Sequence, residues 1–283
     1  MNKLVSICIP TYNGARFLQE ALDSVSWQTY KNIEVIISDD ESADETLQIA
    51  EDFKNSSPFP VFIYSHQPAG IGANWDNCID KANGKWIKFL FQDDILEPNC
   101  LEEFIKLHKQ TGEEVFFCKR TIIDELGTDI SHLSVIADLQ KDIFLNFNDY
   151  YTFKKEDLKY LSSDRGYLSR NFAGEPVASF VSKKAFLRTG EHNRKLKQLL
   201  DLEYNLRLLE KYKLVITAQK LVKFRVHPDQ TTIRNWQKHV NEHEKLNDII
   251  IKKFFIYLSR RAILGYYYNK FPLLKNIRGK MPI

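Results

Sequence analysis

The sequence predicts an α/β fold with a Rossmann-like half, a mixed and mainly parallel central sheet, and a C-terminal helical extension. Three observations lead to this class. Short apolar runs alternate with amphipathic stretches along the first hundred residues. The apolar runs end in polar or acidic residues, as strands do at the ligand-binding edge of an open sheet. Beyond residue 235 the chain becomes basic and aromatic, which marks a separate segment.

The first half of the predicted domain, residues 1–98, alternates strands and helices with short loops. This alternation implies parallel pairing and right-handed crossovers. Phe17 and Leu18 share one apolar face with Leu22, and Ser42 with Glu45 has the spacing of a capping box at a helix start. Strands are expected over 4–10, 33–38, 61–65 and 86–91, and helices over 15–26, 43–53 and 70–81.

The second half, residues 99–235, is less regular. Residues 124–170 are polar and aromatic with weak periodicity, so we expect an insertion that covers the crevice at the sheet edge. The extension, residues 236–283, begins with a long helix. Elements are expected as helix 99–110, strand 115–118, strand 174–181, helix 199–209, strand 221–226 and helix 237–264.

Charge is distributed unevenly along the chain. The net charge is +3, but residues 245–283 contain nine Lys or Arg and one acidic residue, giving +8 there and −5 elsewhere. Such a tail suits an anionic surface, and its many Ile, Phe, Leu and Tyr residues favour a membrane interface over nucleic acid. No apolar run is long enough to span a bilayer, and the start lacks the shape of a signal peptide.

The four cysteines lie in apolar surroundings without metal-ligand spacing. We therefore expect reduced core thiols and a cytoplasmic protein, with contact at the inner face of the membrane as a further possibility.

Polar residues follow three of the predicted strands. Thr11 and Tyr12 follow the first, Asp39 and Asp40 the second, and the pair Asp93-Asp94 the fourth. The strand-end rule places these loops at one crevice. Two adjacent carboxylates there suit a divalent cation such as Mg²⁺ or Mn²⁺. Taken alone, the pair fits metal binding and capping of the next turn equally well.

The sequence lacks two motifs that are typical of Rossmann enzymes that bind a nucleotide cofactor, so that class is less well supported. Gly70 and Gly72 do not form a G-x-G-x-x-G fingerprint, and no lysine-containing phosphate loop follows the first strand. The same absence argues against a nucleotidyltransferase, although that class also uses strand-end carboxylates and a divalent ion.

Seven segments, in order and spacing, resemble the family-2 inverting glycosyltransferases, which have the GT-A fold. The resemblance covers residues 3–235 and rests on the combination, since each segment alone is common. The segments are Val5-Ser-Ile-Cys-Ile-Pro-Thr-Tyr-Asn-Gly14, Asp39-Asp-Glu-Ser-Ala-Asp44, Gly70-Ile-Gly-Ala-Asn-Trp75, Lys88-Phe-Leu-Phe-Gln-Asp-Asp94, Asp201-Leu-Glu-Tyr-Asn-Leu-Arg-Leu208 with Gly174-Glu-Pro176 before it, and Phe224-Arg-Val-His-Pro228.

The resemblance implies a nucleotide-binding set. Pro10, Thr11 and Tyr12 would lie against the nucleotide, with Tyr12 stacked on the base. Asp40 would accept the N3–H of uracil or thymine while Asp39 supports the loop. Asn74, Asn77 and Asp93 would contact ribose or phosphate; for the two asparagines a structural helix start is an equal alternative.

The resemblance also implies a metal site and a catalytic base. Asp93, Asp94 and His227 would hold Mn²⁺ or Mg²⁺, with Asp94 the favoured direct ligand, and Asp201 would deprotonate the acceptor. Capping of its helix is the alternative for Asp201. Many relatives carry carboxylates where this chain has Phe91 and Leu200, which leaves open a binding module that has lost activity.

Glu175 and Arg225 would serve the acceptor and the diphosphate. The implied partners are a nucleotide-sugar donor, UDP or dTDP favoured, and a glycan or lipid-linked acceptor in cell-surface polysaccharide synthesis. Residues 249–280 would form an apolar face with basic flanks that contacts the membrane, or would pack on the core instead. We favour packing up to Phe255 and membrane contact from Tyr257 to Lys280.

Overall fold

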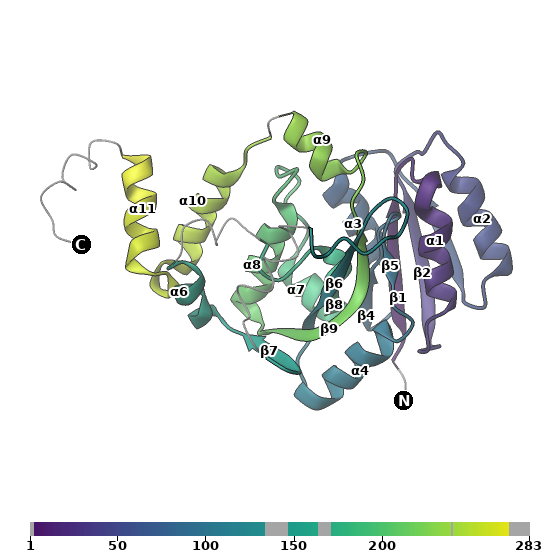
Figure 1. Cartoon of the computed structure of the whole chain (residues 1–283), viewed down its shortest axis with the longest axis horizontal. Coiled ribbons are helices and arrows are strands. Elements are labelled where there is room, and N and C mark those ends of the chain that lie inside the picture. Colours follow the sequence, from purple (N-terminus) through teal and green to yellow (C-terminus); the bar gives the residue numbers. More distant parts are fainter. Residues whose placement is uncertain (1–2, 134–146, 164–170, 239, 272–283) are drawn as a thin grey trace, which may run out of the picture.

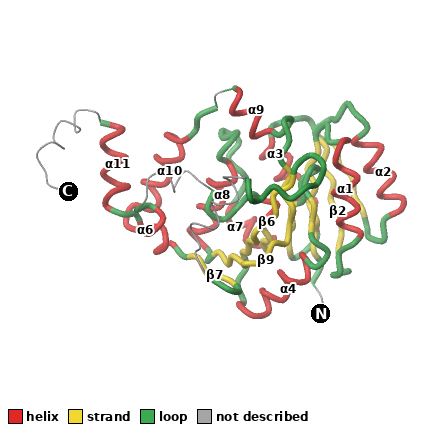
Figure 2. Tube along the Cα trace, in the orientation of Figure 1, coloured by secondary structure: helices red, strands yellow, loops and turns green. Residues whose placement is uncertain are grey.

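The computed structural model describes residues 3–133, 147–163, 171–238 and 240–271. Its centre is one mixed sheet, seen as a yellow band between red helices in Figure 2, with the strand order β3-β2-β1-β4-β8-β6-β9-β5 and β7 beside β9. The strands are β1 Val5–Thr11, β2 Ile33–Asp39, β3 Val61–Ser65, β4 Trp86–Phe89, β5 Ile95–Leu96, β6 Val115–Ile123, β7 Tyr150–Phe153, β8 Ser179–Ser182 and β9 Leu214–Arg225.

The predicted α/β class with a mixed central sheet is confirmed. The main helices are α1 Ala15–Ser26, α2 Thr46–Ser56, α3 Ile71–Lys81, α4 Cys100–Thr111, α6 Leu158–Leu161, α7 Lys183–Thr189, α8 Leu200–Lys211, α9 Thr231–Gln237, α10 His243–Phe254 and α11 Arg260–Lys270. Strands β3, β2, β1 and β4 pair in parallel, and β8 joins β4 and β6 in antiparallel fashion.

Both faces of the sheet are covered. Alternate residues of β1 enter different apolar clusters, Cys8 on one face and Ile7 with Ile9 on the other. Such two-sided burial explains why β1 is apolar throughout rather than alternating. The parallel half therefore presents its strand ends, and not its faces, to a ligand.

The start of α2 differs from the prediction. The helix begins at Thr46 and not at residue 43, because Ser42 does not cap it. The Ser42 hydroxyl instead donates to Asp39 Oδ1 at 2.6 Å and accepts the backbone N–H of Asn13 at 2.8 Å. The serine thus joins the loops that follow β1 and β2.

The long helix predicted over 237–264 is broken into α10, the 3-10 turn η4 (Phe255–Tyr257) and α11. The break coincides with Ser259, whose hydroxyl caps α11 at Ala262 and whose backbone N–H donates to the Ser162 hydroxyl at 2.7 Å. These contacts replace the helical bonds that a continuous helix would make at this position.

Helix α10 belongs to the core. Its Leu246, Ile250 and Phe254 are buried in the same apolar cluster as the α8 side chains. In contrast, α11 has no buried residue and lies on the opposite side of the molecule from α1 and α2 (Figure 1). Among the described residues, no helix combines the length and apolarity that crossing a bilayer requires.

Candidate active site

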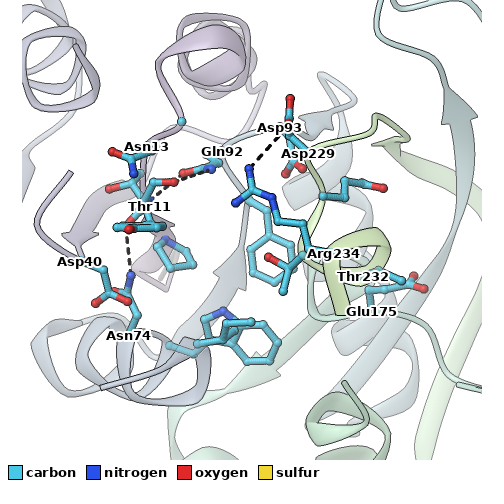
Figure 3. Close-up of a pocket in the computed structure, with 18 of the residues that line it drawn as sticks. Thr11, Asn13, Asp40, Asn74, Gln92, Asp93, Glu175, Asp229, Thr232 and Arg234 are labelled. Carbon is cyan, nitrogen blue, oxygen red and sulfur yellow. Dashed lines mark hydrogen bonds and ion pairs between the residues drawn. The ribbon is translucent and has the colours of Figure 1, made fainter. Parts of the chain in front are cut away.

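A cleft of about 740 Å³ opens at the strand ends, between the loops after β1, β2 and β4 and the starts of α8 and α9. Figure 3 shows Thr11, Asp40 and Asn74 on one side of the cleft and Asp93, Glu175 and Arg234 on the other. Nine residues singled out from the sequence line it: Pro10, Thr11, Tyr12, Asp40, Asn74, Asp93, Glu175, Asp201 and His227.

Tyr12 is held by Gln92 in both directions. Its backbone N–H donates to Gln92 Oε1 at 2.8 Å, and Gln92 Nε2 donates to its carbonyl at 3.2 Å. The side chain of Gln92 therefore holds the backbone of the loop after β1 in place through two hydrogen bonds. Tyr12 is 52% exposed, as stacking of its ring on a base requires.

Asp39 lies beneath the cleft as a loop support. The carboxylate is fully buried and accepts the Thr11 hydroxyl at 2.8 Å and the Ser42 backbone N–H at 2.7 Å. Asp40, the next residue, turns into the cleft. Asn74 Nδ2 donates to the carbonyl of Thr11 at 3.2 Å, which fixes the start of α3 to the same loop (Figure 3).

Asp93 and His227 meet at the other side of the cleft. His227 Nε2 lies 3.0 Å from Asp93 Oδ2. Asp94 is 1% exposed, does not line the cleft, and accepts the Arg225 backbone N–H at 3.0 Å. Burial, reinforced by the charge of Asp93, raises the pKa of the Asp94 carboxyl.

These donors fit a divalent ion that is shared with a ligand. No cluster of three or more His, Cys, Asp or Glu in the described part of the chain could hold a metal alone. Two buried polar atoms at this point, Asp94 Oδ2 and His227 Nδ1, nonetheless make no hydrogen bond to the described residues. Hard ions on phosphorylated ligands need only one or two carboxylates, since phosphate oxygens complete the shell.

Asp201 faces the cleft from the first turn of α8. Asn171 Nδ2 donates to its Oδ2 at 2.7 Å. Burial raises the pKa of Asp201 to about 7, with a smaller contribution from the nearby charge of Glu175. Glu175 itself pairs with Arg120 at 2.5 Å. A carboxyl that titrates near neutrality in a cleft is suited to proton transfer.

Two further residues lie elsewhere than expected. The Arg225 side chain is 1% exposed, and its guanidinium donates to the carbonyls of Asp93 and Asp124 and to Glu20, so it is not directed at a ligand. Asn77 does not line the cleft and donates to the Ser38 hydroxyl at 2.7 Å. The buried guanidinium of Arg225 thus stabilises the loop that contains Asp93 through its hydrogen bond to the Asp93 carbonyl.

The expected cover over the crevice is not formed by the described part of residues 124–170, none of which lines the cleft. Strand β7 in this segment pairs with β9 instead. Residues 134–146 and 164–170 lie outside the described part of the chain.

The profile of Glycosyl transferase family 2 matches residues 6–173. The chain belongs to this family. The match covers the three strand-end loops and Asn171, while Asp201 and His227 lie beyond it.

Three comparisons place this family-2 chain among known proteins. It is 27% identical over 252 residues to an uncharacterized glycosyltransferase of Rickettsia typhi, covering 88% of this chain and 72% of the relative. Staphylococcus aureus TarS 1-349 in complex with UDP-GlcNAc has a TM-score of 0.65 and 16% identity, covering 88% and 66%. The mannosyltransferase PcManGT of Pyrobaculum calidifontis, in complex with GDP-Man and Mn²⁺, has a TM-score of 0.66 and 13% identity, covering 94% and 70%.

The structural neighbours share the fold at low identity. Three other Rickettsia glycosyltransferases are much longer, and the match with this chain spans 20–40% of their length. The family-2 core is thus one part of those proteins.

Some residues of the family-2 site had no recognisable signal in the sequence. Gln92 and Asn171 act through hydrogen bonds to residues 80 and 30 positions away. Arg234 lines the cleft from α9 and lies 3.6 Å from Asp229 (Figure 3). Only Gln92, next to Asp93, stood beside a residue that the sequence had singled out.

Proposed function

We propose that this protein is an inverting, metal-dependent glycosyltransferase that moves a sugar from a nucleotide diphosphate, with UDP or dTDP favoured, to a hydroxyl group. One observation carries the proposal. Asp93 and Asp201, which come from opposite halves of the domain, line the same cleft. The donor can then lie between a cation-holding carboxylate and a base that faces the acceptor.

The chemistry follows from this arrangement. The acceptor hydroxyl attacks the anomeric carbon while Asp201 takes its proton, and the bond between that carbon and the diphosphate oxygen breaks. Attack from the side opposite the leaving group inverts the anomeric configuration. A raised pKa near 7 makes Asp201 a stronger base than an ordinary aspartate and keeps part of it ionised at neutral pH.

Asp93 and His227 are the residues that would hold Mn²⁺ or Mg²⁺, with Asp94 behind them. A bound ion would supply charge neutralisation for the departing diphosphate. Arg234 is better placed than Arg225 to contact phosphate, because its side chain is half-exposed at the cleft.

The acceptor is proposed to be a glycan or a lipid-linked glycan of a cell-surface polysaccharide, held near Glu175. Next to α11, Phe255 is 46% exposed and Ile256 80% exposed. Lys252, Lys253 and the arginines at 260 and 261 flank them. Exposed apolar side chains with cations on either side in the sequence are suited to an anionic membrane surface at the cytoplasmic face.

Binding and turnover test the donor assignment. Thermal shift with UDP, dTDP, GDP and CMP in the presence of Mn²⁺ should show stabilisation by UDP or dTDP, and EDTA should remove most of it. Slow metal-dependent release of UDP from a UDP-sugar without acceptor would mark a transferase. Nucleotide binding without any release would indicate the inactive binding module instead.

Liposome sedimentation tests the membrane contact. Full-length protein should pellet with anionic vesicles and less with zwitterionic ones, and Ile256→Glu should reduce pelleting. Leu126→Glu is the matched control, since Leu126 is 89% exposed far along the chain from this patch. Equal pelleting of both variants would contradict this part of the proposal.

A further inference from the structure

We infer that His66 sets the nucleobase preference of the cleft by occupying one oxygen of Asp40, which leaves the other as a single acceptor for the base. The inference rests on the proposed function, because it concerns the donor nucleotide of the same cleft. It adds His66, at the end of β3, as a specificity-determining residue.

The two oxygens of Asp40 have different surroundings. His66 Nε2 lies 2.9 Å from Oδ1. Oδ1 is buried and makes no hydrogen bond with the described residues, so its contact with His66 is an ion pair, whereas the residue itself lines the cleft. Oδ2 is therefore the oxygen that a ligand can reach.

Hydrogen-bond partners specify the protonation of the His66 ring. Nδ1 lies 2.8 Å from the carbonyl oxygen of Gln67, which can only accept, so Nδ1 carries a hydrogen. Asn74 donates through Nδ2 to Thr11, which turns its Oδ1 toward His66 Nε2 at 3.4 Å. Nε2 thus faces two acceptors, Asp40 and Asn74.

A hydrogen on both ring nitrogens makes the imidazole a cation. Its ion-pair partner is Asp40, and the acidic side chains of Asp39 and Glu41 lie close enough to affect Asp40. Burial raises the pKa of Asp40, and the positive charge of His66 opposes that rise. The pair therefore holds Asp40 as a carboxylate with Oδ1 already engaged.

A single free oxygen distinguishes the bases by their donors. Uracil and thymine present one ring N–H, at N3, which one oxygen satisfies. Guanine presents N1–H and an exocyclic N–H side by side, which match a carboxylate with both oxygens free. Cytosine has an acceptor at N3, which would face Oδ2 without a hydrogen between them. An unpaired polar group of this kind weakens binding.

Calorimetric titration of UDP, dTDP, GDP and CMP with Mg²⁺ tests the inference. Wild type should bind UDP and dTDP at least tenfold more tightly than GDP. His66→Ala frees Oδ1, so the ratio of GDP to UDP dissociation constants should fall by about tenfold, or roughly 1.4 kcal/mol. His66→Gln, whose amide N–H can donate to Oδ1, should keep the wild-type ratio. His243→Ala, at an exposed histidine of α10, is the control.

Thermal denaturation of each variant confirms that it is folded.

Two failures are distinguishable. An unchanged UDP to GDP ratio in folded His66→Ala, with UDP binding still lost in Asp40→Ala, would overturn the role of His66 alone. No nucleotide binding by wild type, or undiminished UDP binding by Asp40→Ala, would overturn the proposed function instead.

Discussion

Asn171 Nδ2 donates a 2.7 Å hydrogen bond to Asp201 Oδ2. The amide is itself fixed, because its Oδ1 accepts the backbone N–H of Gly174 at 3.2 Å and Nδ2 of Asn205 at 3.0 Å. The proposed base thus has one donor on each oxygen, because Oδ1 accepts the backbone N–H of Leu202 at 2.7 Å. Asn171 is a positioning residue in this arrangement.

Asn171→Ala should lower kcat by about 10- to 100-fold, since a hydrogen bond to a charged group contributes about 1.5–3 kcal/mol. The bond also lowers the pKa of Asp201, so its loss should move the rising limb of the kcat profile to higher pH. Steady-state kinetics at several pH values would measure both effects. Asn55→Ala, at an exposed position of α2, should change neither.

Activity should rise with pH through about 7, because the base must be ionised and burial raises the pKa of Asp201 to about 7. Asp201→Asn should reduce kcat by about 10²–10⁴-fold while UDP binding persists. A wild-type profile that is flat between pH 5.5 and 8.5 would contradict the assignment of the base.

The same shift has a consequence for stability. The folded state retains the proton up to about pH 7, whereas the unfolded chain loses it near the ordinary value of 3.8. The folded state therefore binds more protons between these values, and the contribution of Asp201 to stability declines as pH rises through this window. Denaturant unfolding of wild type and Asp201→Asn at pH 5 and 8 would measure the difference.

Gly14→Ala should weaken donor binding. A Cβ at this position would overlap the side-chain amide of Gln92, which two hydrogen bonds hold against Tyr12. Displacing Gln92 removes both bonds, so we expect the UDP dissociation constant to rise by about tenfold, at roughly 1 kcal/mol per bond with partial relaxation. Gln92→Ala should give a similar rise. Gly265→Ala in α11, where a Cβ meets no atom within 4 Å, is the control.

Glu242→Gln should destabilise the protein and slow the reaction. The buried Glu242 carboxylate accepts the backbone N–H groups of Lys197, Gln198 and Leu199 at 2.8, 2.9 and 3.1 Å, directly before α8. An amide can accept with only one oxygen, so we expect a loss of about 1–3 kcal/mol. Thermal melting and kcat would report this loss. Glu244→Gln, at an exposed position in the first turn of α10, should match wild type.

The sequence was most informative where structure is local or repetitive. The bounds of α1 and β3 were predicted to the residue, because their apolar patterns are regular and uninterrupted. The convergence of strand ends required only the topology of a parallel sheet. The bounds of each element depend on residues that lie close together along the chain, and the topology follows from the order of these elements.

Predictions failed where distant contacts override local pattern. Ser42 has the spacing of a helix cap but bonds Asp39 and Asn13, and Ser259 interrupts an amphipathic stretch through Ser162. A strand pattern could not show that Arg225 turns beneath the Asp93 loop, away from the cleft. Alternation assigns a side chain to a face and leaves its partners open.

The carboxylate of Glu242 anchors the segment that enters α8, and behind it Leu246, Ile250 and Phe254 complete the apolar cluster that backs this helix. During synthesis, a ribosome releases the loops after β1, β2 and β4 long before it releases these anchors. The nascent polypeptide can therefore form the proposed donor pocket first, whereas Asp201 reaches its final position only after residues 242–254 have emerged.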